Sequence, residues 1–351
     1  MDNNIVTTGV TEIVLPDKVE PDGLQVAVRD LPAPVAGQVV LRMEATGVSF
    51  AEQQMRRGKY FDQPPFPFVP GYDLVGTVTA VGPGADTALI GRRFAAITKT
   101  GAWADHVLVD AADLLPVPDG LDPAAVATVL INGITAWQML HRTAEARPGG
   151  TVVVLGANGG VGSTLVQLAR HAGMTVIGTA AARHHDTVRE LGATPVDYRA
   201  PDMYDRIRKI APDGVDAVFD HIGGPGVAQS WRLLRRGGTL VSYGTAATKD
   251  EDGNSQLPVL KLFAQLAAWN SLPNGKSAHF YSFWAGRRCQ ETFQRRLRED
   301  LTRVLRLVAD GALTPQIAAR FPLSEAASAL KLAESRTVTG KVVIVPDTRR
   351  P

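Results

Sequence analysis

The 351-residue sequence contains one cysteine, Cys289, so no disulfide bond can form within the chain. Such a cysteine count is typical of a reducing compartment, and we expect a cytoplasmic protein. The seven histidines are scattered, and none is paired with the cysteine at the spacing of a metal site. The sequence therefore predicts no bound metal.

Charge and hydrophobicity exclude two further classes of function. The 37 basic and 35 acidic residues leave a net charge of +2, and no block of basic residues indicates nucleic-acid binding. No apolar run approaches the ~20 residues that cross a bilayer, and residues 1–6 lack the basic and apolar regions of a signal peptide. We expect a two-domain soluble enzyme with a small-molecule substrate and with neither nucleic acid nor membrane as partner.

The most informative segment begins at Thr151. An apolar, β-branched run over 151–155 predicts a buried parallel strand, and a glycine-rich turn and an apolar helix follow it. The turn reads Ala157-x-Gly159-x-x-Gly162, in the strand–turn–helix setting of a dinucleotide-binding fingerprint. Its glycines and the helix N-terminus favour close approach of a pyrophosphate. The predicted cofactor-binding residues of this turn are Asn158, Gly159, Gly160, Val161 and Gly162.

The end of the next apolar run, residues 174–179, predicts which dinucleotide binds. An NAD site places a carboxylate there against the ribose hydroxyls. This chain has Arg183 and His184 instead, which would attract a 2′-phosphate, and Asp186 lies too far beyond the strand. The sequence therefore favours NADP(H), although a solvated helix start at these residues remains an alternative.

The pattern of elements predicts an α/β fold with two domains. Short β-rich segments with Pro- and Gly-rich turns fill the first 130 residues and indicate an irregular β-barrel. Strands and helices then alternate, which indicates a doubly wound parallel sheet. We expect a long amphipathic helix over 290–309 and a last strand over 341–345 that returns to the N-terminal barrel. The expected domains are 1–130 with 285–351, and 131–284.

Several motifs in order resemble the medium-chain dehydrogenase/reductase superfamily, in its zinc-free quinone oxidoreductase and enoyl reductase branch. They include Gly47-Val-Ser-Phe50, Pro70-Gly-Tyr-Asp73 and Gly101-Ala-Trp103, followed by the glycine-rich turn and Leu191-Gly-Ala193. The resemblance implies a GroES-like β-barrel catalytic domain and a Rossmann cofactor domain. Zinc-dependent members carry a cysteine and Gly-His-Glu where this chain has Ser49 or Phe50 and Gly71-Tyr72-Asp73. The resemblance therefore implies metal-free hydride transfer.

The remaining cofactor residues are expected around the nicotinamide and the 2′-phosphate. The nicotinamide is expected in the interdomain cleft, beyond the carboxyl ends of the strands. By resemblance, Tyr198 contacts the 2′-phosphate and Lys341 lies at the cofactor cleft. The alternative for Tyr198 is packing at the edge of a strand, and the alternative for Lys341 is a cap on the surface of the C-terminal tail. The residues expected near the nicotinamide and its ribose are Asn132, Thr135, Tyr243, Gly244, Thr245, Phe283 and Trp284.

The expected reaction is hydride addition to the β-carbon of an α,β-unsaturated carbonyl or to a quinone. Negative charge then builds on an oxygen, which needs a donor, and a proton must be supplied. The candidate catalytic residues are Tyr60, Tyr72 and Ser49, with Lys59 as a further donor and water as a competing proton source. Ser49 and Gln54 depart from the quinone oxidoreductase pattern, which has Asn and Tyr there.

The aromatic residues expected in the cleft indicate a bulky apolar or planar substrate. Two alternatives stay open: a reductive cyclase on a polyketide-like intermediate, and a non-catalytic NADPH-binding protein. Similar proteins imply a homodimer through the strand around 278–283, where an unpaired apolar edge would favour association.

Overall fold

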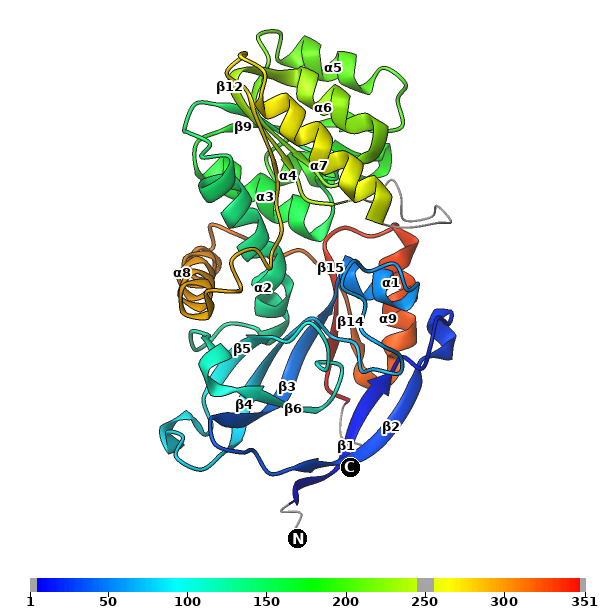
Figure 1. Cartoon of the computed structure of the whole chain (residues 1–351), viewed down its shortest axis with the longest axis vertical. Helices are drawn as coiled ribbons and strands as arrows, with labels where there is room; N and C mark the ends of the chain where they lie inside the picture. Colours follow the sequence, from blue (N-terminus) through cyan, green and yellow to red (C-terminus); the bar gives the residue numbers. More distant parts are fainter. Residues whose placement is uncertain (1–4, 245–255, 348–351) are drawn as a thin grey trace. The chain divides into compact units, whose positions relative to one another are not determined.

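The computed structural model describes residues 5–244 and 256–347 of the chain. The chain forms two compact units (Figure 1). The first unit contains Met1–Ile131, Gln294–Ala309 and Pro315–Pro351, and the second contains Asn132–Phe293 and Asp310–Thr314. A β-rich unit and a parallel-sheet unit confirm the expected α/β fold class.

A mostly antiparallel sheet forms the centre of the first unit. Its strand order is β14-β15-β3-β4-β5-β7, and β6 also pairs with β3. The last strand, β15, pairs antiparallel with β3 and parallel with β14, as expected for a chain that returns to its beginning. The strands are β3 (Gln38–Val48), β4 (Asp73–Val81), β5 (Arg93–Ile97), β6 (His106–Asp110), β7 (Leu115–Pro116), β14 (Ile317–Pro322) and β15 (Lys341–Val345).

Strand β3 is the hub of this sheet because β4, β6 and β15 all pair with it. Its side chains are therefore buried along most of its length, among them Leu41 and Met43, and Trp103 lies in the same core. Burial of each large apolar side chain contributes roughly 1.5–3 kcal/mol.

Smaller elements complete the first unit. The sequence did not predict the hairpin of β1 (Ile5–Val14) and β2 (Gln25–Pro32), whose Val26 and Val28 are exposed. The helices α1 (Phe50–Arg56) and α9 (Ala326–Ser335) were also not predicted. The helix α8 (Gln290–Ala309) has the predicted bounds, and Leu297, Leu301, Val304 and Leu305 are its buried face within this unit.

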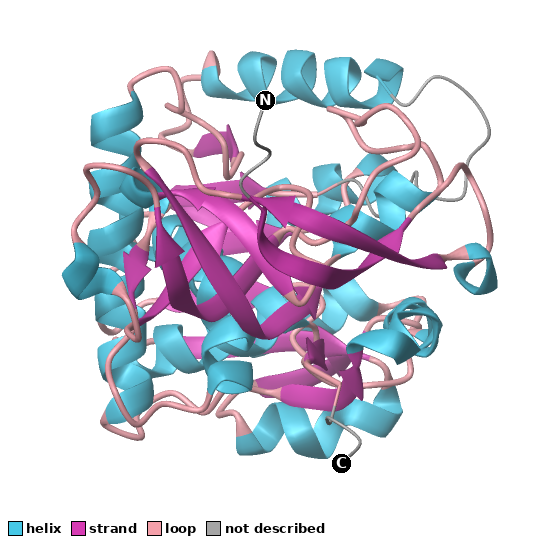
Figure 2. Ribbon diagram, turned by 90° about the horizontal axis from the view of Figure 1, so that it is seen from below, coloured by secondary structure: helices cyan, strands magenta, loops and turns pink. Residues whose placement is uncertain are grey.

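The second unit is built on a parallel sheet of order β10-β9-β8-β11-β12-β13. The expected alternation of parallel strands and helices is present. Figure 2 shows all strands of the chain in magenta and all helices in cyan. The strands are β8 (Thr151–Val154), β9 (Thr175–Ala180), β10 (Thr194–Asp197), β11 (Val215–Asp220), β12 (Leu234–Ser242) and β13 (Ser277–Phe280). The helices are α3 (Gly160–His171), α4 (His185–Glu190), α5 (Met203–Ile210), α6 (Val227–Leu233) and α7 (Gln256–Asn270).

One helical segment corrects the sequence analysis. The helix α2 (Pro123–Trp137) continues as a π-helical turn to Thr143, and Pro123–Thr143 is long and apolar enough to cross a membrane. The expectation that no apolar segment reaches this length is therefore wrong. However, 78% of its 18-residue apolar window is buried inside the protein, which also fits a core helix. Asp122 caps its start by accepting the Ala124 N–H at 3.1 Å.

Candidate functional site

One edge of the second unit's sheet collects most of the predicted cofactor residues. The carboxyl ends of parallel strands meet at a single edge, and here Ala180 pairs with Asp197 while Asp220 pairs with Ser242. The strand order changes direction between β8 and β11, where open α/β sheets bind ligands. The segments that follow these strands are the turn 156–162, residues 181–184, Tyr198 and residues 243–244.

The turn before α3 is built for close approach of a ligand to its main chain. Gly156 has a φ of +70°, and its carbonyl accepts the Gly159 N–H at 2.9 Å. A Cβ on Gly162 would lie 2.1 Å from the Gly156 oxygen, and one on Gly160 would lie 2.4 Å from Nδ2 of Asn132. Position 162 therefore requires glycine, whereas a side chain at 160 would require the Asn132 side chain to move.

The beginning of α3 provides donors for an anion. Gly160 is the first helical residue, and Gly159 is the extended N-cap. The N–H groups of a first helical turn have no acceptor within the helix, so Gly160, Val161 and Gly162 can donate to a pyrophosphate. Asn158 belongs to the same turn, and its half-buried side chain completes the set of residues that fit the cofactor.

Arg183 and His184 form a hydrogen-bonded pair just beyond β9. Arg183 Nε donates to His184 Nε2 at 3.0 Å, and His184 is 8% exposed, so it is not part of a solvated helix start. Burial lowers the pKa of His184, and the Arg183 cation lowers it further. Arg183 is therefore the cation of this pair at neutral pH. The Asp186 carboxylate forms an ion pair with Arg189.

Tyr198 lies at the same edge as this pair. It follows β10, its N–H donates to the Ala180 carbonyl at 3.3 Å, and it is 46% exposed. The guanidinium of Arg199 lies 5.6 Å from its ring centroid. The phenol is thus accessible to a ligand beside β9.

The segment after β12 is held against the end of β11. The Tyr243 N–H donates to the Asp220 carbonyl at 2.9 Å, and burial, with the Asp220 charge, raises the pKa of Tyr243. A Cβ on Gly244 would lie 2.5 Å from the His221 carbonyl oxygen. Thr245 lies outside the described residues.

The other predicted residues lie in two segments of the second unit. Asn132 and Thr135 are buried in α2, and Asn132 lies against Gly160. Phe283 and Trp284 follow β13, with their rings nearly perpendicular and their centroids 5.4 Å apart. Trp284 also stacks on Phe293.

Sequence reasoning missed His221, which follows β11 at the ligand-binding edge. Its Cε1 lies 2.5 Å from the position of a Cβ on Gly156, and its ring is 6.0 Å from that of Tyr243. The signal was available, because a residue that directly follows a predicted parallel strand belongs to this edge.

The first unit joins two of the predicted catalytic residues directly. The hydroxyls of Tyr60 and Tyr72 are 2.9 Å apart, a hydrogen bond in which either can be the donor, and the rings meet edge to face. Tyr72 is buried and Tyr60 is half-buried. Lys59 precedes Tyr60 in the same loop, where its N–H donates to the Gln54 carbonyl.

A buried glutamate, which the sequence did not reveal, lies beneath these residues. Glu52 of α1 accepts the Tyr72 N–H at 2.9 Å with Oε1 and the Ser49 N–H at 2.8 Å with Oε2. Burial raises the pKa of Glu52 to about 7, and the charge of Asp73 acts in the same direction, whereas Lys341 and the main-chain N–H groups of Glu52 and Tyr72 act against it. The carboxyl therefore titrates near neutral pH.

Two buried polar atoms in segment 49–63 have no hydrogen-bond partner among the described residues. They are Gln54 Nε2 and Gln63 Oε1. Buried polar atoms are nearly always satisfied, so such a group indicates that water or a polar ligand reaches this segment.

Lys341 forms a buried ion pair in the first unit. Its Nζ lies 2.9 Å from Oδ2 of Asp73 and also donates to the Ala127 carbonyl at 3.3 Å. Lys341 is 4% exposed, so the surface-cap alternative is wrong. Oδ1 of Asp73 accepts the Gly47 N–H at 3.2 Å. A Cβ on Gly47 would lie 1.9 Å from Cε of Lys341, so glycine there makes room for the lysine.

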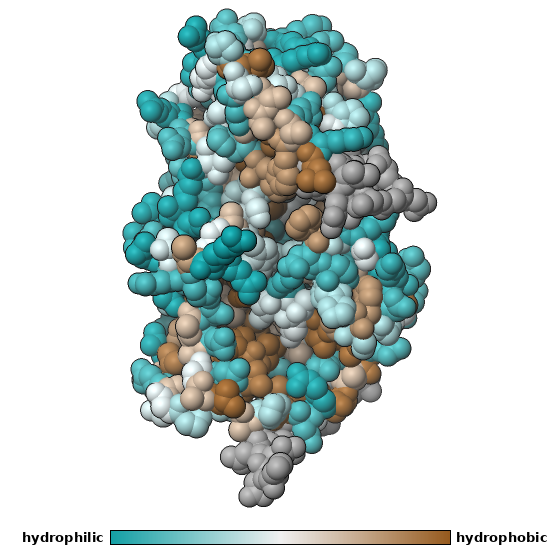
Figure 3. Space-filling view, in the orientation of Figure 1, coloured by the Kyte–Doolittle hydropathy of each residue, from teal (hydrophilic) through white to brown (hydrophobic). Residues whose placement is uncertain are grey.

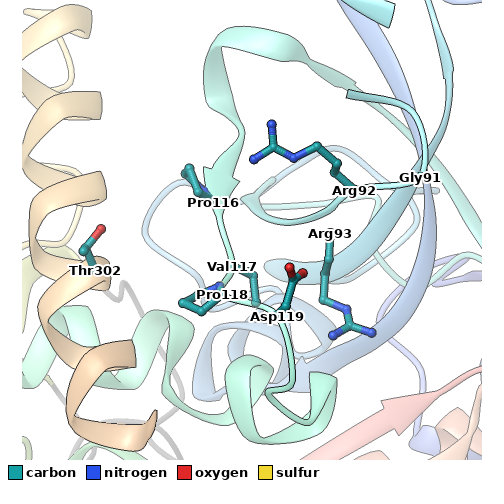
Figure 4. Close-up of a pocket in the computed structure, with 8 residues that line it drawn as sticks. All are labelled: Gly91, Arg92, Arg93, Pro116, Val117, Pro118, Asp119 and Thr302. Carbon is teal, nitrogen blue, oxygen red and sulfur yellow. The ribbon is translucent and has the colours of Figure 1, made fainter. Parts of the chain in front are cut away.

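Neither a metal cluster nor the first unit's described pocket adds to this site. Among the described residues, no group of three or more His, Cys, Asp and Glu side chains could hold a metal ion. A pocket of about 540 Å³ lies where Arg92, Asp119 and Thr302 converge (Figure 4). It contains none of the predicted catalytic residues.

Comparison with known proteins identifies the family. The alcohol dehydrogenase GroES-like domain model matches residues 35–119, and the model described as zinc-binding dehydrogenase matches residues 191–344. The synaptic vesicle membrane protein VAT-1 homolog of mouse is 34% identical over 321 residues, which cover 90% of this chain and 78% of that protein. The chain belongs to the medium-chain dehydrogenase/reductase superfamily. Within it, this reductase belongs to the quinone oxidoreductase and enoyl reductase branch.

Solved structures of this superfamily share the fold. A mycobacterial protein complexed with NADPH is 27% identical, has a TM-score of 0.81, and aligns over 96% of this chain and 100% of its own. An Escherichia coli quinone oxidoreductase complexed with NADPH has a TM-score of 0.82 at 24% identity, over 96% and 100% of the two chains. A cyclopropanase from curacin A biosynthesis has the same score at 21% identity, over 96% and 99%. The last two show the fold alone.

The buried ion pair generates a prediction about stability. Replacing Lys341 by Met leaves Asp73 as an uncompensated buried charge, which costs about 3–5 kcal/mol in the free energy of unfolding. Urea unfolding of the full chain measures this loss. The control is Lys331→Met, because the Lys331–Asp22 pair is exposed and worth less than about 1 kcal/mol. Equal losses in the two variants would contradict the prediction.

Proposed function

We propose that this protein is an NADPH-dependent reductase that delivers hydride, without zinc, to a conjugated carbonyl or a quinone. The main support for the proposal is the set of residues at the ligand-binding edge of the second unit. There a helix N-terminus with an obligatory glycine at 162 stands at the same edge as the cation Arg183, and residues 181–185 contain no carboxylate. This edge suits a pyrophosphate and a 2′-phosphate. The NADPH bound to the mycobacterial relative supports the choice of cofactor.

Residues of the second unit bind the cofactor, and residues of the first unit contact the substrate. The first turn of α3 binds the pyrophosphate, Arg183 and Tyr198 bind the 2′-phosphate, and bound NADPH supplies the hydride. The first unit supplies hydroxyl donors: Tyr60 or Tyr72 donates to the oxygen on which negative charge develops. Gln54 Nε2, which has no hydrogen-bond partner among the described residues, provides a further polar contact for a substrate.

The donor set near the tyrosine pair does not suit zinc. Zinc binds Cys, His and carboxylate ligands in close geometry, whereas the tyrosine pair here hydrogen-bonds internally and the Glu52 carboxyl is committed to main-chain N–H groups. We therefore propose metal-free turnover in the cytoplasm, on a bulky apolar substrate.

Turnover with a panel of acceptors tests the reaction. Purified protein should oxidise NADPH, followed by its absorbance, with conjugated enones or quinones, and chelators should leave the rate unchanged. A rate that falls with a chelator and returns with zinc would contradict the metal-free proposal. A ring-closed product, seen by mass spectrometry and NMR, would favour the reductive cyclase. Tight NADPH binding with no oxidation by any acceptor would favour a non-catalytic protein.

Arg183 sets the predicted preference between cofactors. Arg183→Ala should weaken NADPH binding roughly 10- to 100-fold, the loss expected for a hydrogen bond to a charged group, and leave NADH binding nearly unchanged. Calorimetry with both nucleotides measures the difference. The matched control is Arg189→Ala on the next helix, which removes an exposed arginine paired with Asp186. Equal weakening of NADPH and NADH would rule out the phosphate role.

We also propose a homodimer through the second unit's edge strand β13. The neighbouring helix α7 exposes Leu260 (59%) and Phe263 (43%), and Figure 3 shows apolar residues gathered there. Exposed apolar groups beside an open edge favour association. Leu260→Lys should shift sedimentation from dimer to monomer, whereas Val28→Lys, on the hairpin of the first unit, should not. A monomeric wild-type protein would refute the proposal.

A further inference from the structure

The candidate donors of the first unit come from three separate segments. Ser49 follows β3, Tyr60 lies in the loop after α1, and Tyr72 precedes β4. Glu52 connects two of them, because its two oxygens accept the Ser49 and Tyr72 N–H groups. The third is connected through the hydrogen bond between the Tyr60 and Tyr72 hydroxyls. One carboxyl group therefore links all three segments.

The surroundings of Glu52 show which contacts are its own. Asp73 is fully buried, and its carboxylate contacts Lys341 and the Gly47 N–H. Lys341 Nζ contacts Asp73 and the Ala127 carbonyl. Asp73 and Lys341 thus hold residues 47, 127 and 341 together, whereas Glu52 accepts the N–H groups of Ser49 and Tyr72. The Tyr72 carbonyl also accepts the Thr98 and Lys99 N–H groups at 3.0 and 3.1 Å.

The location of Glu52 is energetically demanding. It is 2% exposed and close to the second buried carboxylate, Asp73, and burying a charged or polar group is costly unless it is hydrogen-bonded. Its side-chain hydrogen bonds join Ser49, at the start of α1, to Tyr72, just before β4. The Tyr72 hydroxyl in turn hydrogen-bonds to the Tyr60 hydroxyl. A carboxyl group at this point fixes the geometry of a donor pair.

We infer that Glu52 is the positioning residue of the donor site: it fixes the main chain of Ser49 and Tyr72 and, through Tyr72, the hydroxyl pair that serves the reacting carbonyl. Glu52 does not touch the substrate or exchange a proton with it. The inference rests on the proposed reductase function, and it names the residue on which the donor geometry depends.

Glu52→Gln tests this role with almost no change in volume. A glutamine has one oxygen and one NH₂ group, so either Ser49 or Tyr72 loses its acceptor and faces a donor. We expect kcat for enone reduction to fall roughly 10- to 100-fold, the loss of a hydrogen bond to a charged group. The Kd for NADPH, measured by calorimetry, should not change. Glu52→Asp retains both oxygens on a shorter side chain and should recover part of kcat.

A double-mutant cycle with Tyr72→Phe separates positioning from general stability. If Glu52 acts through the Tyr72 hydroxyl, Glu52→Gln lowers kcat little further in the Tyr72→Phe background. Losses in kcat that multiply would overturn the inference. The matched control is Glu44→Gln, whose half-buried carboxylate on β3 binds Thr77 and Arg93; its kcat should equal that of the wild type.

A crystal structure of Glu52→Gln separates this inference from the proposed function. We expect the Tyr60–Tyr72 hydrogen bond to be broken or displaced, which is observable even if no acceptor is reduced. An unchanged hydroxyl pair in this variant would overturn the inference while the reductase proposal stands. A wild-type protein that reduces no acceptor would refute the reductase proposal and, with it, the inference. If Glu52→Gln does not fold, the double-mutant cycle and the crystal structure are carried out with Glu52→Asp instead.

Discussion

The buried ion pair between Asp73 and Lys341 organises the first unit. Asp73 contacts Gly47 and Lys341 through its carboxylate, and its main-chain carbonyl accepts the Thr46 hydroxyl. These contacts join the end of β3, the beginning of β4 and the beginning of β15. Charges buried this deeply are tolerated only when each has a partner, so the three strand ends are held in one arrangement. Glu52 and the tyrosine pair lie directly beside Asp73 and depend on that arrangement.

The second unit suits the binding of a large anion, as proposed above, largely through main-chain groups. Its parallel sheet brings the turn 156–162, Arg183 and Tyr198 to one edge, although they are separated in sequence. In the proposed function the main-chain N–H groups of α3 are the donors, and their close approach to a ligand is helped by Gly162, where a Cβ would collide with the Gly156 carbonyl oxygen. Arg183 supplies the positive charge in this proposal, because burial and the Arg183 charge lower the pKa of His184 and keep that imidazole neutral.

Local patterns predicted the regular elements well. The six parallel strands and the bounds of α8 followed from apolar periodicity, and the glycine-rich turn fixed the position of α3. The hairpin β1–β2 was missed: Val26 and Val28 have the two-residue spacing of a strand, but both are exposed, so this spacing does not mark a buried face. The donors Tyr60 and Tyr72 were named from resemblance, but Glu52 was not, because a glutamate in a helix is usually solvated. Its contact with Ser49 has the local Ser-x-x-Glu spacing of a capping box, but its second contact, with the Tyr72 N–H, joins residues that are distant in sequence and is recorded by no local pattern.

The return of β15 to β3 has a consequence for biosynthesis. Val342 pairs with Val48, so the sheet of the first unit needs a strand from the far end of the chain. The residues of the second unit, which end at Thr314, are all synthesised before that strand. The second unit can therefore form from its own sequence first, whereas one side of β3 stays unpaired until β15 has been made. An unpaired strand edge of this kind is prone to wrong association while the chain is being synthesised.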